Sequence, residues 1–128
     1  MNDQTLLHRQ INPAWLQAGE VTSQAFRPTP KDERKLSVYD GDQISADASL
    51  GHFVNTLGLR SVGVLSVAVH ECSTLELPCA ADPLPFPEHA VIDFAGLTEK
   101  QTKKKGKQLR ALAVDRGWQS QFSQGGVS

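Results

Sequence analysis

Four polar residues stand inside or beside short apolar segments, where neighbouring strands would hold their side chains in fixed directions. They are Arg9 in Arg9-Gln-Ile-Asn-Pro13, Ser23 in Ser23-Gln-Ala-Phe26-Arg-Pro28, Ser37 in Leu36-Ser-Val38, and His89 in Asp82-Pro-Leu-Pro-Phe-Pro-Glu-His89-Ala90. A guanidinium binds phosphate or carboxylate through a planar fork, a hydroxyl both donates and accepts, and an imidazole exchanges protons near neutral pH. We therefore take Arg9, Ser23, Ser37 and His89 as candidate ligand-binding residues.

These four segments resemble a family of small uncharacterised bacterial proteins. That family carries an R-x-I-x-P opening, an S-x-x-F-x-P segment, an L-S-V strand and a D-P-x-P-x-x-P-x-H-A segment, in the order found here from Arg9 to the final helix. The chain departs from the pattern at Asn12, where the family often has histidine or another small residue. The resemblance brings no activity with it.

A purely structural role for the same residues is an open alternative. Arg9 could pair with an acid such as Asp93, the two serines could bond strand edges, and His89 could anchor the proline-rich loop. Polar groups that become buried need hydrogen-bond partners whether or not they bind a ligand.

Arg9 on a first strand and Ser37 on a later one also resemble the arrangement that holds the dinucleotide in ADP-ribosyltransferases. By that analogy, Arg9 would bind pyrophosphate, Ser37 the ribose, and His89 would orient the substrate. The glutamate expected later in the chain has three candidates without a motif: Glu71, Glu76 and Glu88. Because function depends on the site and not on the fold, a shared cleft for Arg9, Ser37 and His89 is the structural feature that tests this analogy.

Other catalytic signatures are missing from the sequence. There is no G-x-S-x-G elbow, no Walker loop and no G-x-G-x-x-G segment, which argues against a hydrolase. His70, Cys72, Cys79 and His89 are competent metal ligands, but their spacing matches neither a C-x-x-C pair nor an H-E-x-x-H helix. We predict no bound metal and no resident cofactor.

Lysine is concentrated near the C-terminus. From Thr98 to Arg116, seven Lys and Arg residues stand against two acids, whereas the whole chain carries a net charge of −1. Lys100, Lys103, Lys104 and Lys107 would lie on one helical face, either as a solvated surface or as a phosphate-binding one. The run lacks interleaved aromatic residues for stacking on bases, so we favour the solvated surface and expect weak binding of nucleic acid at most.

The composition indicates one domain. The chain has 128 residues and 39% hydrophobic residues, which suits a single core. The N-terminus shows no secretory signal and no run approaches the ~20 apolar residues of a membrane span. Two cysteines are too few for a secreted disulfide scaffold, so we expect reduced thiols, a cytoplasmic location and no membrane contact.

Periodicity places the elements around these residues. We predict strands at 5–11, 21–26, 36–39, 62–69 and 89–94, short helices at 13–18 and 71–77, and longer ones at 45–57 and 98–116. Residues 27–35 read as an exposed loop and 82–87 as an irregular proline-rich one.

These elements predict an α+β fold with one small mixed or mainly antiparallel sheet packed by two or three helices. We expect a single domain over 1–117 and a flexible tail over 118–128. With no catalytic signature in the sequence, we favour a binding or accessory module that acts with a protein partner. A small nucleotide-using transferase is the alternative, and whether the chain is an enzyme stays open.

Overall fold

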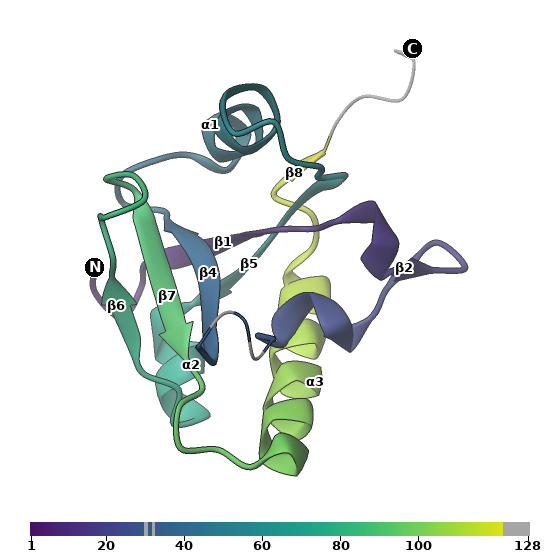
Figure 1. The fold of residues 1–128 in the computed structure, drawn as a ribbon, viewed down its shortest axis with the longest axis vertical. Coiled ribbons are helices and arrows are strands. Elements are labelled where there is room, and N and C mark those ends of the chain that lie inside the picture. The colour runs from purple at the N-terminus through teal and green to yellow at the C-terminus, as the bar shows by residue number, and fades with distance from the viewer. Residues whose placement is uncertain (30, 32, 122–128) are drawn as a thin grey trace.

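The computed structural model describes residues 1–29, 31 and 33–121, and within them a six-stranded antiparallel sheet forms the centre of the fold (Figure 1). Across the sheet the strands are β6 (Cys79–Ala81), β7 (His89–Asp93), β4 (Lys35–Asp40), β1 (Leu6–Gln10), β5 (Gly63–Ala68) and β8 (Ser120–Gln121). The helices are α1 (Ala46–Gly51), α2 (Val69–Thr74) and α3 (Glu99–Arg116), and β2 (Leu16–Gln17) forms a small hairpin with β3 (Glu20–Val21). The predicted α+β class, with a mainly antiparallel sheet packed by helices, is confirmed.

One face of the sheet packs against α3 and the 3₁₀ turn Ser23–Phe26. Alternate residues of the strands point to this side, because side chains along a strand alternate between faces. The buried cluster includes Leu7, Ile11, Phe26, Leu36, Val38, Leu65, Val67, Ile92, Phe94, Leu109 and Ala113. β5 is buried along its whole length, as its nearly continuous apolar sequence predicts for a strand covered on both faces.

α3 begins and ends where the sequence predicts. Thr98 accepts a hydrogen bond from the backbone N–H of Gln101, whose side chain accepts one from the N–H of Thr98, so the capping box is formed. Gly117 follows the helix with φ 92°, a conformation that costs glycine little. Among the described residues, no helix has the length and apolar character needed to cross a membrane.

The predicted helix at 45–57 is two segments of different winding. Ser45 caps α1, its Oγ accepting from the N–H of Ala48, but from His52 to Thr56 the chain continues as a π-helical segment. Phe53 and Leu57 therefore do not follow Leu50 at the spacing of one continuous α-helix. Leu50 is buried in the protein, whereas Leu57 is 40% exposed.

Two predicted elements near the N-terminus are wrong. The helix expected at 13–18 is only a 3₁₀ turn, Pro13–Trp15, and the chain then forms the β2–β3 hairpin. Ala18 and Gly19 both have positive φ, 52° and 81°, which is the geometry of a two-residue hairpin turn with the correct twist. The strand expected at 21–26 is largely the 3₁₀ turn Ser23–Phe26.

The predicted loop and tail lie partly outside the described residues: Pro30 and Asp32 of the loop, and 122–128 of the tail. Within the described part of the tail, Ser120 and Gln121 form β8, which pairs with Val64 and Gly63 of β5. The N–H of Gln119 also donates to the carbonyl of Val64. Residues 118–121 therefore pack on the domain that we expected to end at 117.

The sheet opens between β1 and β4. These two strands pair only at Leu7 with Asp40 and His8 with Tyr39, while β1 pairs with β5, and β4 with β7, over five residues each. Figure 1 shows the consequence: β4 and β7 run steeply across the direction of β1. Beyond His8 the two strands diverge and leave space between them.

Candidate functional site

A cavity of about 260 Å³ lies where β1 and β4 diverge. Its walls come from residues 8–10 of β1, 37–39 of β4, His89 of β7, Phe53 of the π-helical segment, and 57, 59, 85 and 86 of the connecting loops. Ligand pockets in proteins are commonly ~300–1,000 Å³, so this cavity is slightly smaller than a typical ligand pocket.

Three of the four candidate residues line this cavity together: Arg9, Ser37 and His89. Ser23 does not. It lies in the 3₁₀ turn Ser23–Phe26 and faces a separate hollow beside Lys107 and Arg110 of α3. The shared cleft that tests the transferase analogy is therefore present for Arg9, Ser37 and His89, and Ser23 lies outside it.

Arg9 bridges the gap between the diverging strands. Its Nη1 donates to the carbonyl of Ser37 at 2.9 Å and its Nε to the carbonyl of Ala25 at 2.8 Å. The guanidinium carbon also lies 4.8 Å from the centre of the Trp15 ring, a cation–π arrangement. These contacts tie β1 to β4 and to the Ser23–Phe26 turn. Asp93, which the sequence analysis considered as a partner for Arg9, accepts a hydrogen bond from the N–H of Ala95.

Ser37 and His89 meet because of the register between β4 and β7. Tyr39 is directly opposite His89 and Ser37 opposite Val91, so Ser37 and His89 are diagonal neighbours on one face, within reach of a long side chain. The distance from Ser37 Oγ to His89 Nε2 is 3.1 Å. A one-residue change of register would put the two side chains on opposite faces.

Asp82 holds the other side of the His89 ring. His89 Nδ1 lies 2.9 Å from the backbone carbonyl of Asp82 and 3.5 Å from its carboxylate Oδ2. A carbonyl oxygen only accepts, so Nδ1 carries the proton of a neutral ring. Nε2 is then left with its lone pair toward Ser37.

Aromatic rings form one wall of the cavity. Tyr39 stacks on Phe86 with ring centres 5.0 Å apart, and Phe86 meets His52 and His89 edge-on at 4.7 and 5.2 Å. Tyr39 Oη and His52 Nδ1 share a hydrogen bond of 2.8 Å. Burial, with a smaller effect from the charge of Glu88, raises the pKa of Tyr39 to about 12. The phenol is therefore neutral at physiological pH.

His8 and Gln10 line the cavity from β1. His8 Nδ1 lies 2.7 Å from Ser66 Oγ, and burial lowers the pKa of His8 against smaller opposing effects of the Ile44 backbone and the Asp40 charge. Gln10 Nε2 donates to Ser49 Oγ at 3.0 Å, while Gln10 Oε1 is buried and finds no donor among the described residues. Such an unsatisfied buried acceptor is uncommon in folded proteins.

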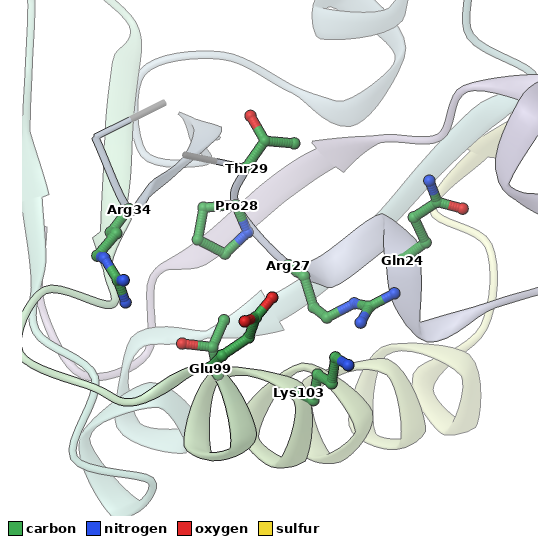
Figure 2. Close-up of a pocket in the computed structure, with 8 residues that line it drawn as sticks. Gln24, Arg27, Pro28, Thr29, Arg34, Glu99 and Lys103 are labelled. Atoms are coloured by element: carbon green, nitrogen blue, oxygen red, sulfur yellow. The ribbon is translucent and has the colours of Figure 1, made fainter. Parts of the chain in front are cut away.

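The lysine-rich face is exposed on α3, at Lys100, Lys103, Lys104 and Lys107. Beside it, a hollow of about 300 Å³ is lined by Arg27, Arg34, Lys103 and Glu99, among others. Figure 2 shows Glu99 between the side chains of Arg34 and Arg27, with Lys103 extending along the α3 side. Three cations and one acid make this hollow positively charged. It is separate from the cavity that holds Ser37.

Cys72 and Cys79 are both free thiols in the structure, Cys72 buried and Cys79 half-buried. A hydrogen bond between the two thiols and burial raise the pKa of Cys72, and the same hydrogen bond lowers the pKa of Cys79. Within residues 1–29, 31 and 33–121, no group of three or more His, Cys, Asp or Glu side chains is placed to hold a metal ion.

Tyr39, His52, Asp82, Phe86 and Gln10 belong to this site but were not selected from the sequence. Tyr39 could have been found, because it follows Ser37 by two residues in a strand and so shares its face. Asp82 and Phe86 lie inside the segment that ends at His89. The position of His52 depends on the π-helical winding, which no pattern in the sequence predicts.

Comparison of the chain with models of protein families, with curated proteins and with solved structures finds no match to any of them.

Proposed function

We propose that the cavity between β1 and β4 binds a nucleotide and that the protein is a small nucleotide-using transferase resembling ADP-ribosyltransferases. The observation that carries this proposal is the convergence of Arg9, Ser37 and His89 on one cavity. These residues come from three different strands. If each had only a structural role, nothing would require them to line the same cleft.

The chemistry of the walls supports a nucleotide. Tyr39 and Phe86 offer flat apolar surfaces on which a base or a nicotinamide ring would stack, worth ~1–3 kcal/mol per base. The charge of Arg9 would attract pyrophosphate, and Ser37 would bond a ribose hydroxyl. Because the cavity is small, about 260 Å³, we expect it to take one nucleoside half of a dinucleotide.

Among the three glutamates weighed for the transferase, Glu88 is the one supported by its position. It precedes His89, and its charge acts on Tyr39 in the cavity wall. Glu71 Oε1 instead accepts from Arg116 and from the N–H of Ala68, and those bonds give it a structural role on α2.

Titration with NAD⁺, ADP-ribose and AMP, followed by calorimetry and by NMR of the full chain, tests the proposal. We expect NAD⁺ to shift the resonances of Tyr39 and Phe86, and Phe86→Ala to weaken binding at least tenfold. Ser23→Ala is the matched control, because it changes a residue outside the cavity, and it should bind as the parent does. Absence of binding by all three nucleotides would refute nucleotide recognition at this site.

A cytoplasmic bacterial accessory module acting with a protein partner is a second proposal, and one surface feature favours it. Leu84 is 92% exposed at the tip of the proline-rich loop, an apolar side chain presented by a stiff segment. If this loop docks on a partner, a stoichiometric protein that co-purifies from the native host should be lost with Leu84→Asp. It should be kept with Lys107→Ala, which changes a different face. Equal recovery with both variants would exclude docking through the loop.

A further inference from the structure

Ser37, His89 and Asp82 form a hydrogen-bonded series that ends at an exposed hydroxyl. The backbone carbonyl of Asp82 accepts from His89 Nδ1 at 2.9 Å, and Nε2 of the neutral ring then accepts from Ser37 Oγ at 3.1 Å. Both distances fall in the ~2.6–3.2 Å range of nucleophile–base pairs whose base is oriented by a third group.

The burial of the three residues suits this arrangement. His89 is only 7% exposed, so little water competes for its nitrogens, whereas Ser37 is exposed and lines the cavity. The guanidinium of Arg9, bonded to the carbonyl of Ser37 at 2.9 Å, places a positive charge beside the hydroxyl. Negative charge that develops near Ser37 Oγ would be stabilised there.

We infer that Ser37 is a nucleophile, with His89 as its general base and Asp82 as the residue that orients the ring, and that its substrates are small esters with a flat apolar portion. This activity goes beyond nucleotide binding and does not depend on it. The aromatic wall of Tyr39 and Phe86 would hold the flat portion, and the cavity of about 260 Å³ limits the substrate to a small molecule.

The chemical step balances with water as the only co-reactant. Ser37 Oγ forms a bond to the carbonyl carbon while its proton moves to His89 Nε2. The ester C–O bond then breaks, and the leaving alcohol takes that proton. Water attacks the acyl-Ser37 and gives its proton to His89, which returns it to Ser37 as the carboxylic acid leaves.

A fluorophosphonate probe tests the nucleophile directly, because attack by Ser37 forms an O–P bond and expels fluoride. We expect one adduct per folded chain, mapped by peptide mass spectrometry to Ser37 and abolished by Ser37→Ala. Ser23→Ala, a serine outside the cavity, should label at the parent rate. His89→Gln should slow labelling about 100-fold or more, the usual range of a general base.

Since His89 is buried, thermal melts must show that His89→Gln is folded. Asp82→Asn provides a second variant at an exposed side chain; it keeps the backbone carbonyl and should slow labelling less than His89→Gln does. Hydrolysis of p-nitrophenyl acetate should follow the same order of variants. Three results would overturn the inference. The probe could label Ser23 instead of Ser37, it could fail to label the folded chain, or it could label the parent and folded His89→Gln at equal rates. None of these results bears on nucleotide binding, which the calorimetric titrations decide separately.

Discussion

His89 Nε2 lies 3.1 Å from Ser37 Oγ, although the two residues are 52 positions apart in the chain. The contact joins two paired strands, β4 and β7, beside the place where β1 diverges from β4. Both residues thus hold their positions through backbone pairing, and the cavity forms beside a rigid pair of strands.

Replacement of Arg9 should lower the stability of the protein as well as weaken ligand binding. Arg9→Ala removes two bonds from a cation to backbone carbonyls, and hydrogen bonds of charged groups contribute about 1.5–3 kcal/mol each. We expect a loss of about 2–4 kcal/mol in a denaturant titration. Arg9→Lys keeps the charge but replaces the planar fork, whose two nitrogens bond the two carbonyls, with a single ammonium group, so it should recover only part of the loss. Full stability of Arg9→Ala would show that these bonds contribute nothing.

Gly106 and Gly51 make a matched pair of helical glycines. A Cβ at Gly106 would lie 2.5 Å from Arg27 Cγ and 3.1 Å from the carbonyl oxygen of Phe26, whereas one at Gly51 meets nothing within 4 Å. Gly51→Ala should therefore stabilise the protein by about 0.5–1 kcal/mol, from reduced backbone entropy. Gly106→Ala should destabilise it, because α3 must move away from the Ser23–Phe26 turn. Thermal melts of both variants check the prediction, and a stabilising Gly106→Ala would contradict the close packing.

His8 should make the protein less stable in mild acid. Its pKa lies below the ordinary 6.5 in the folded state because it is buried, so the unfolded chain takes up a proton first as the pH falls. The free energy of unfolding should then decrease from pH 7.5 to 5.5. His8→Gln should therefore reduce this slope. An NMR titration showing an elevated pKa for His8 would reverse the sign of the effect.

The two thiols should differ in reactivity. Cys79 is half-buried with a lowered pKa, while Cys72 is fully buried with a raised one, and only the thiolate reacts rapidly. Iodoacetamide should therefore modify Cys79 before Cys72 in the native protein, as followed by peptide mass spectrometry. After denaturation without reductant, both should titrate as free thiols; a finding of none would exclude the reduced state.

The basic face of α3 should bind nucleic acid weakly and without sequence preference, with affinity lost by physiological salt, because neutralising phosphates releases counterions. Lys103→Glu with Lys104→Glu should abolish the binding seen at low salt. The same change of charge at Lys35, exposed on β4, combined with Lys31→Glu, is the control. Fluorescence anisotropy across a salt series measures it, and tight binding at physiological salt would assign this face a specific partner.

The α+β class, the capping box of α3 and the buried strand β5 could be predicted from the sequence because each depends on local periodicity or on residues three or four positions apart. Thr98 and Gln101 bond within one helical turn, and the apolar run from Gly63 to Ala68 is buried in any sheet that covers both of its faces. The β2–β3 hairpin was missed, since Pro13 followed by Ala and Trp suits a helix start equally well, and β2 and β3 are only two residues long.

The groups available for chemistry can be identified in the sequence: a guanidinium at Arg9, a hydroxyl at Ser37 and an imidazole at His89, each next to a strand-forming segment. That these three share a cavity, and that Ser23 lies outside it, is known only from the fold. The register of β4 on β7 and the early divergence of β1 from β4 depend on packing across the whole sheet, and the spacing of residues along the chain specifies neither of them.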